Sequence, residues 1–277
     1  MHQVSDRELK RVRTIAIVGC GSLGAIIARG IRDGAAGPYR TIAVYNGADG
    51  KRAESLAAEV GAVAYRTLDS LLAIGPDYVV EAANIQALRE LVVPALAAGS
   101  HVIALSIGAF ADPSFHALAT CAAQENGKTV YLASGAIGGL DVTQSAAIAG
   151  ELRAFMLTEK PPRGLVGAPG FRGEMSLSEP TEIFAGTAID AIEAFPKNVN
   201  VVATLALAAG GFSHVTTRIV SNPKLSHNRH TIELAGRFGI ARIEIESAAS
   251  PENAKSSTLA AYSVLAKLKA LASPIQI

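Results

Sequence analysis

The chain has 277 residues, 49% of them hydrophobic, and its 25 basic and 24 acidic residues give a net charge of +1. This length and apolar content predict a well-packed core and favour two domains over one. The balanced charge argues against nucleic acid or an anionic membrane surface as partner. Two cysteines are too few for a disulfide framework, and the polar N-terminal stretch has no apolar signal core, so we expect a cytoplasmic protein. The longest apolar run, residues 199–212, falls short of the roughly 20 residues that a membrane span needs.

A glycine-rich turn follows the first strand-like run, residues 14–18. Residues 19–24 read Gly-Cys-Gly-Ser-Leu-Gly, the GxGxxG spacing, and lead into apolar residues at helical spacing. Gly19 permits the tight turn, Gly21 lets the backbone approach a pyrophosphate, and Gly24 lets the helix pack against the strand. The flanking patterns favour a dinucleotide cradle over a purely structural turn. The predicted cofactor contacts here are Gly19, Gly21, Ser22, Leu23 and Gly24.

The residue after the second apolar run, residues 41–45, bears on cofactor choice. An acidic side chain about 20 positions past the glycines would bind the ribose 2′-hydroxyl of NAD. Asn46 stands there instead, with Lys51 and Arg52 shortly after it. Asparagine can still bond a ribose hydroxyl and the cations can accept a 2′-phosphate, so NAD and NADP are both permitted. Alternatively, the two cations are only the solvated start of a helix.

Strand-like and helical patterns then alternate. Residues 78–82, 101–106 and 129–133 read as strands, residues 85–98 form a helix capped by Asn84, and a further helix starts at residues 112–113. These repeats predict a Rossmann-type, doubly wound parallel sheet. Ligands bind beyond the carboxyl ends of such strands, so the predicted cofactor contacts also include Asn46, Ala82, Ala83 and Ser106.

Residues 134–141, Ser-Gly-Ala-Ile-Gly-Gly-Leu-Asp, mark a change of pattern. Beyond them, residues 155–158, 215–220, 231–235 and 240–247 read as an antiparallel set of strands, with helices in residues 190–208 to cover one face. A final amphipathic helix, residues 256–272, is expected to pack back onto the first domain. We therefore expect a dinucleotide-binding domain, residues 1–134 joined by 251–277, and an α+β substrate domain, residues 135–250.

Several separated motifs in the second half occur in a characteristic order. They are the SGAIGGLD stretch at 134–141, FPKNVN at 195–200, Asn228-Arg229-His230, and SPEN at 250–253 followed by Lys255. From about residue 13 onward the chain resembles the L-aspartate dehydrogenase family. The resemblance implies oxidative deamination of L-aspartate to iminoaspartate and then oxaloacetate and ammonia, with NAD or NADP as cofactor and a homodimer as assembly. In some relatives the imine feeds NAD biosynthesis.

The resemblance also assigns residues. It implies His230 as the catalytic histidine and Ala136 and Asn200 as nicotinamide-side contacts. Asn46 departs from the family, which usually carries an acidic residue there, and this bears on cofactor choice rather than on the reaction.

The chemistry of amine oxidation fits a histidine, because imidazole exchanges protons near neutral pH. His227 competes with His230, and their odd spacing on a strand places them on opposite faces, so only one should meet the substrate. A dicarboxylate also needs a cation or oriented donors. Lys197 and Asn198 are the predicted substrate contacts beside His230, although both also fit a solvated, capped helix start.

Other interpretations stay open from the residues. Glu81 and Asp141 are taken as structural. The six histidines have no carboxylate or cysteine at ligand spacing, so we predict no metal. An oxidoreductase acting on another small amino acid or imine would share the fold, as would a protein that binds a dinucleotide without chemistry.

Overall fold

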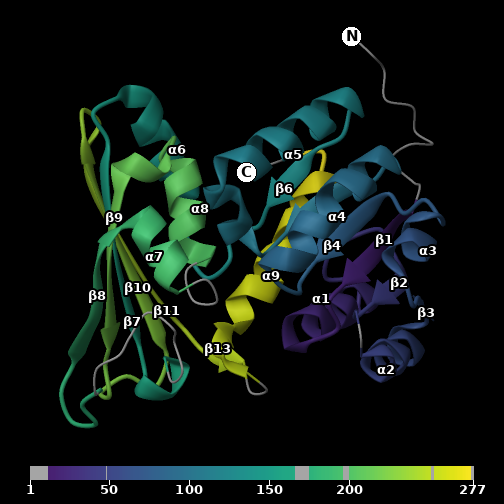
Figure 1. The fold of residues 1–277 in the computed structure, drawn as a ribbon, viewed down its shortest axis with the longest axis horizontal. Coiled ribbons are helices and arrows are strands. Elements are labelled where there is room, and N and C mark those ends of the chain that lie inside the picture. The colour runs from purple at the N-terminus through teal and green to yellow at the C-terminus, as the bar shows by residue number, and fades with distance from the viewer. Residues whose placement is uncertain (1–11, 48, 166–174, 196–199, 251–252, 276–277) are drawn as a thin grey trace. The chain divides into compact units, whose positions relative to one another are not determined.

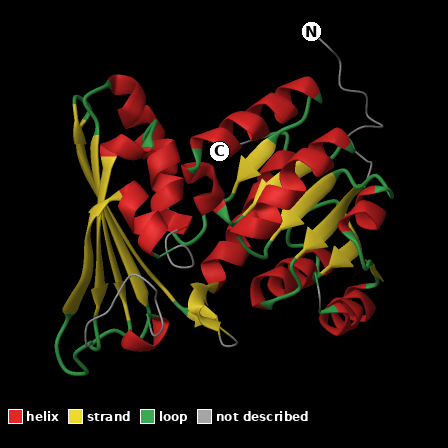
Figure 2. Ribbon diagram, in the orientation of Figure 1, coloured by secondary structure: helices red, strands yellow, loops and turns green. Residues whose placement is uncertain are grey.

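The computed structural model describes residues 12–47, 49–165, 175–195, 200–250 and 253–275. The chain divides into two compact units. The first comprises Met1–Ser106, Ser114–Ala133 and Ala261–Ile277, and the second comprises Ile107–Pro113 and Ser134–Ala260. The elements of both are labelled in Figure 1 and distinguished by type in Figure 2.

The first unit is built on a six-stranded sheet in the order β3-β2-β1-β4-β5-β6, with every pairing parallel. Its strands are β1 (Arg13–Val18), β2 (Tyr39–Tyr45), β3 (Val63–Ala64), β4 (Tyr78–Glu81), β5 (His101–Ala104) and β6 (Val130–Leu132). The helices are α1 (Ser22–Arg32), α2 (Gly50–Val60), α3 (Leu68–Leu72), α4 (Ile85–Ala97), α5 (Pro113–Glu125) and α9 (Thr258–Ala272). This strand order is that of a dinucleotide-binding fold and confirms the predicted doubly wound sheet.

Apolar strands and capped helices explain why these segments form. Ile15 and Ile17 of β1 are fully buried, as expected for a central strand covered on both faces. The side chain of Asn84 accepts a hydrogen bond from the Ala87 amide at 3.0 Å and caps α4 as predicted. Strands β4 and β5 end one and two residues earlier than the apolar pattern suggested, at Glu81 and Ala104.

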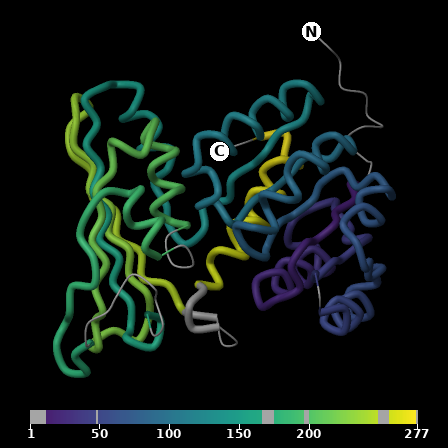
Figure 3. The backbone as a smooth tube through the Cα atoms, viewed as in Figure 1, coloured from purple at the N-terminus to yellow at the C-terminus, as the bar shows by residue number. Residues whose placement is uncertain are grey.

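The C-terminal helix α9 packs in the first unit although it is the last helix along the described chain (Figure 3). Val264 and Leu268 on this helix are completely buried. Gly30 of α1 leaves the space that Leu265 fills, because a Cβ on Gly30 would lie 2.4 Å from Leu265 Cδ1. The guanidinium of Arg13 donates to the carbonyl oxygen of Leu271 at 3.1 Å. The two ends of the described chain therefore meet in one unit.

The second unit has a five-stranded sheet in the order β11-β10-β7-β9-β8. Its strands are β7 (Arg153–Lys160), β8 (Thr181–Thr187), β9 (Val215–Ser221), β10 (Asn228–Gly236) and β11 (Gly239–Ser247). Figure 1 shows helices α6 (Leu140–Ala149), α7 (Ala188–Ala194) and α8 (Asn200–Ala208) on one face of this sheet. Short elements complete the unit: η1 (Ile107–Ala111), η2 (Pro162–Gly164), η3 (Phe212–His214), β12 (Ala249–Ser250) and β13 (Asn253–Ser257).

The expectation of a purely antiparallel set was wrong, because β7 and β9 pair in parallel. The chain leaves β7, forms β8 and helices α7 and α8, and only then returns as β9, which is the long crossover that a parallel pair requires. Strand β8 had not been singled out in the sequence. The result is a mixed sheet.

Burial alternates along the strands of the second unit. In β7 the buried residues are Ala154, Met156, Thr158 and Lys160, while the residues between them are partly exposed. Because α6 to α8 contact β8, β9 and β10, the buried set lies on the helix-covered face. Helix α8 lies within the longest apolar run of the sequence, and its Val202 and Leu205 are almost wholly buried. Among the described residues, no helix is long and apolar enough to cross a membrane.

Candidate active site

The three glycines of the loop in the first unit have different surroundings. A Cβ on Gly24 would lie 1.9 Å from the carbonyl oxygen of Gly19, so α1 approaches the loop more closely than any side chain allows. Gly19 has φ of +102°, and its Cβ would lie 2.6 Å from the backbone of Ala82. A Cβ on Gly21, by contrast, would meet no atom within 4 Å. The loop is thus packed on two sides and open at the start of α1.

Asn46 lies directly after β2 and is bonded to the glycine loop. Its Oδ1 accepts from the Cys20 amide at 2.7 Å, and its Nδ2 donates to the Asp49 carbonyl at 3.4 Å. Asp49 caps α2 by accepting from the Arg52 amide at 3.2 Å. Burial raises the pKa of Cys20 to about 11, so this thiol is a neutral packing group. Asn46 therefore fastens the end of β2 to the loop.

Glu81, at the carboxyl end of β4, is wholly buried. One carboxylate oxygen accepts from the Ala83 amide at 2.8 Å and from the Ser106 hydroxyl at 2.7 Å. The other accepts from the amides of Leu105 at 3.2 Å and Ser106 at 2.9 Å. Burial raises the pKa of Glu81, and these four hydrogen bonds oppose that rise.

The predicted cofactor contacts Ala83 and Ser106 are therefore brought together by a carboxylate. Glu81 joins the segment after β4 to the segment after β5, and Ala82 packs against Gly19 of the loop. The sequence signal was an acidic residue ending an otherwise apolar strand, which had been interpreted as structural.

Asn200 and the segment holding Ala136 meet in the second unit. Asn200 begins α8, and its Oδ1 accepts from the Gly108 amide at 3.1 Å. Ala136 is nearly buried in the segment before α6. The neighbouring Gly135 has φ of +67° and would place a Cβ 3.9 Å from Val201, which follows Asn200 on α8. The two predicted nicotinamide-side residues thus belong to contacting segments.

His230 lies on β10 and is 3% exposed. Its Nδ1 is 3.1 Å from the Oγ1 of Thr158 on the neighbouring strand β7. Burial, and then the positive charge of Lys160, lower the pKa of His230 to about 3. His227, in contrast, is exposed, and its Nδ1 lies 3.5 Å from Glu246. Of the two histidines only His230 is buried, but His227 precedes β10, so the strand alternation expected from their odd spacing does not apply to this pair.

Next to His230 the sheet carries a row of buried polar residues. We call the following set the polar row: Ser247, Asn228, Lys160 and Ser221, each at most 6% exposed. They stand on the adjacent strands β11, β10, β7 and β9, at the same level. Lys160 was missed in the sequence, where Lys197 had been preferred. The sequence signal for Lys160 was a lysine at a position where the alternation of buried and exposed residues along a strand places a buried side chain.

Some residues singled out in the sequence are not placed in the site by the described structure. Lys197 and Asn198 lie outside the described residues. Asp141 stands in the first turn of α6 and is exposed, which suits a helix N-terminus. Within the described ranges, no group of three or more histidine, cysteine, aspartate or glutamate side chains is arranged to hold a metal ion.

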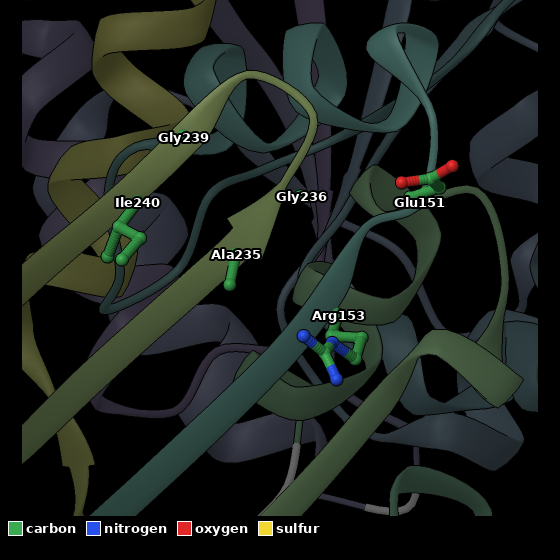
Figure 4. Close-up of a pocket in the computed structure, with 6 residues that line it drawn as sticks. All are labelled: Glu151, Arg153, Ala235, Gly236, Gly239 and Ile240. Atoms are coloured by element: carbon green, nitrogen blue, oxygen red, sulfur yellow. The ribbon is translucent and has the colours of Figure 1, made fainter.

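The pocket in Figure 4 lies at the opposite end of β10 from His230. It is lined by Glu151, Arg153, Ala235, Gly236, Gly239 and Ile240. These residues surround the turn between β10 and β11, and Gly236 stands about 20 Å along the strand from His230. No predicted site residue lines this pocket.

Comparison with known proteins places the chain in a family. It is 38% identical over 269 residues to an L-aspartate dehydrogenase of Methanosarcina barkeri, covering 95% of this chain and 98% of that protein. The chain belongs to the L-aspartate dehydrogenase family. An L-aspartate dehydrogenase of Methanosarcina mazei is 39% identical over 270 residues, again with 95% and 98% coverage. These findings confirm the resemblance seen in the motifs.

Models of domain families and a solved structure agree with membership of the L-aspartate dehydrogenase family. The model of the aspartate dehydrogenase C-terminal region matches residues 141–271, and that of the homoserine dehydrogenase NAD binding domain matches residues 19–133. The crystal structure of an aspartate dehydrogenase from Thermotoga maritima superimposes with a TM-score of 0.74 at 27% identity. That alignment covers 96% of this chain and 100% of the Thermotoga chain.

Proposed function

We propose that this protein catalyses the NAD(P)-dependent oxidative deamination of L-aspartate. The observation that carries the proposal is the 38–39% identity to L-aspartate dehydrogenases over 98% of their length. Identity over the whole length includes both the nucleotide-binding and the C-terminal regions. The products are iminoaspartate and, after hydrolysis, oxaloacetate and ammonia.

The first unit fits NAD or NADP. Open space at Gly21, at the start of α1, suits a pyrophosphate close to the backbone and to the positive end of the helix. Gly19 and Gly24 set the loop's shape, with Ser22 and Leu23 in the first turn of the helix. A nicotinamide held there would supply the acceptor for the hydride that leaves the substrate Cα. We propose that Ala82, Ala83, Ser106, Ala136 and Asn200 also contribute contacts to the cofactor.

Asn46 supports the use of both cofactors. Its Oδ1 is engaged with the Cys20 amide, and it brings no negative charge to the end of β2. A 2′-phosphate therefore meets no carboxylate at this position. Initial rates with L-aspartate and either NAD or NADP, followed by the absorbance of the reduced nicotinamide, test this. A strict requirement for one cofactor would contradict it.

We propose His230 as the group that takes a proton from the substrate ammonium. The lowered pKa leaves the imidazole neutral at neutral pH, with a ring nitrogen lone pair that can take a proton, but burial and the charge of Lys160 make it a weaker base than a free histidine. For Nε2 to act as the base, Nδ1 must carry the hydrogen and donate it to Thr158 Oγ1, and their 3.1 Å separation allows this bond. Thr158 thereby fixes the orientation of the ring.

Replacing His230 tests this role. His230→Ala is expected to lower kcat by at least about 100-fold while the Kd for NADH stays within about twofold. His227→Ala is the matched control, because that histidine is exposed beside Glu246, and it should retain full turnover. If His230→Ala keeps its turnover, the assignment fails.

A panel of amino acids separates the remaining alternatives. Faster turnover of another amino acid or of a cyclic imine would identify that compound as the substrate in place of L-aspartate. Cofactor binding without turnover of any compound in the panel would indicate a non-catalytic protein. The homodimer and the cytoplasmic location are also proposals, supported by the family resemblance and by the two free cysteines. Sedimentation velocity of the purified protein measures the assembly.

A further inference from the structure

The second unit contains buried polar atoms that the described structure leaves without hydrogen bonds. In the described part of the chain four buried side-chain atoms have no partner: Thr41 Oγ1, Ser221 Oγ, Asn228 Oδ1 and Ser247 Oγ. Three of these belong to the polar row. Such atoms are rare in proteins, since each loses its bonds to water on burial. Their gathering in one place indicates a group that they are built to meet.

The strand register shows that these residues are neighbours. Asn228 of β10 pairs with Ser247 of β11, and Lys160 of β7 pairs with Ser221 of β9. The pairing of Arg229 with Glu159 places Asn228 beside Lys160. Adjacent strands lie about 4.8 Å apart, so the four side chains stand in one line on the helix-covered face.

His230 belongs to the same surface. It follows Asn228 by two residues on β10, so both side chains point to the same face about 7 Å apart. Thr158 and Lys160 repeat this spacing on β7. The proposed base and the polar row are therefore successive levels of one face.

We propose that the polar row is the binding site for the ammonium and one carboxylate of the amino acid substrate. The proposal rests on the function proposed above. Lys160 and the Ser221 hydroxyl donate to the carboxylate, and the Asn228 Oδ1 accepts from the ammonium. Ser247 stands on the other side of Asn228 and completes the row.

The chemistry of the row matches this ligand atom by atom. A lysine ammonium and a serine hydroxyl both donate hydrogen bonds and so suit a carboxylate, and the Ser221 hydroxyl has no partner in the described structure. An amide oxygen without a donor suits an ammonium group, which carries only donors. An ammonium held by Asn228 lies within one level of His230, the group proposed to take its proton. Burial is the main cause of the lowered pKa of His230, and a carboxylate bound by Lys160 would reduce the second cause, the positive charge of that lysine.

Direct binding tests the row independently of turnover. Calorimetry with L-aspartate and cofactor-free protein should give a Kd that rises roughly tenfold in Ser221→Ala and in Asn228→Ala. Lys160→Met should raise it by about 100-fold or more. In steady state, Ser221→Ala should raise the KM for L-aspartate by a similar factor, leave kcat within about twofold, and leave the Kd for NADH unchanged.

Thr41→Val is the matched control. Thr41 is also buried, with an Oγ1 that lacks a partner in the described structure, but it lies on β2 of the first unit. Removing this hydroxyl should leave the Kd and KM for L-aspartate unchanged. Thermal unfolding of each variant checks that it folds, and Ser221→Ala should unfold no earlier than the parent, because it deletes a hydroxyl that has no partner.

The outcomes separate the two proposals. Wild-type affinity for L-aspartate in Ser221→Ala, Asn228→Ala and Lys160→Met would show that the row is structural or hydrated, and would overturn the inference. Loss of affinity in these variants, in a protein that binds L-aspartate but does not oxidise it, would keep the row and refute the function. Wild-type protein that neither binds nor oxidises L-aspartate would refute both.

Discussion

Two glycines of the loop are expected to have different roles, one in folding and the other in cofactor binding. Gly24 and Gly21 are three positions apart, yet one faces backbone and the other faces open space. The GxGxxG spacing predicts both roles in general terms, since it follows from the shape of the loop. The contrast between them gives a test that uses the same substitution twice.

Gly24→Ala should destabilise the fold, whereas Gly21→Ala should chiefly weaken cofactor binding. The added methyl group on residue 24 would collide with the Gly19 carbonyl, so we expect a loss of about 3 kcal/mol or more in the free energy of unfolding. The methyl group on residue 21 should leave stability nearly unchanged and raise the Kd for NADH roughly tenfold or more. Urea unfolding and fluorescence titration measure the two effects. Equal effects of both substitutions would contradict the assigned roles.

His230 predicts a pH dependence of stability. Its pKa is about 3 in the folded protein, against an ordinary value of 6.5, so the unfolded chain binds the extra proton between these values. Stability from this group is complete above pH 6.5 and is lost as the pH falls toward 3. Between pH 6.5 and 5 the loss is about 2 kcal/mol. Urea unfolding of the parent and of His230→Gln should show this pH-dependent loss of stability only in the parent. An equally steep fall of the free energy of unfolding with pH in both proteins would argue against His230 as its source.

At the scale of elements, the two ends of β5 are built differently. Ser106 follows the carboxyl end and bonds Glu81, while Ser100 precedes the amino end and donates to the Pro76 carbonyl at 2.6 Å. Both serines are buried. In a parallel sheet only the carboxyl ends of the strands border the ligand. The same chemical change at the two ends should therefore have different functional effects.

Ser106→Ala and Ser100→Ala should each cost about 1 kcal/mol of stability, because each removes a buried hydrogen bond. Only Ser106→Ala should also raise the Kd for NADH, by roughly threefold to tenfold, because it loosens the carboxylate that joins the segments after β4 and β5. Thermal unfolding and NADH titration of both variants measure this. A larger rise for Ser100→Ala would contradict the placement of the cofactor.

Most elements of the first unit could be predicted from sequence, since apolar runs, caps and glycines are local signals. The parallel pairing of β7 with β9 could not, because strand order depends on contacts between residues about 60 positions apart. The same limit applies to the site. The positions of Asn46 and His230 can be located from neighbouring sequence patterns, whereas the alignment of Ser247, Asn228 and Lys160 in one row depends on the strand register.

At the scale of the whole molecule, the first unit is assembled from three separate stretches of the chain. The last of these contributes α9, whose buried side chains include Val264 and Leu268. The amphipathic pattern in residues 256–272 predicts the helix, but its partner follows only from the fold. A change in α9 should therefore act on the unit that holds the glycine loop.

Leu268→Ala should destabilise the protein by about 2–5 kcal/mol, because it leaves a cavity in a fully buried site. Tyr262→Ala on the same helix is the control, since that side chain is 55% exposed and its loss should cost little. Because the helix packs in the first unit, saturating NADH should restore much of the lost thermal stability. Equal unfolding midpoints for Leu268→Ala and Tyr262→Ala would contradict the packing.

The late position of α9 also bears on how the protein is made. The chain emerges from the ribosome N-terminus first, so the glycine loop and its sheet emerge well before the helix that covers Gly30. Until residue 268 has emerged, part of the apolar surface of the first unit has no cover. The whole second unit is translated in that interval. We expect nascent chains halted before α9 to be sensitive to proteases and to bind chaperones, and chains released with the helix to be resistant.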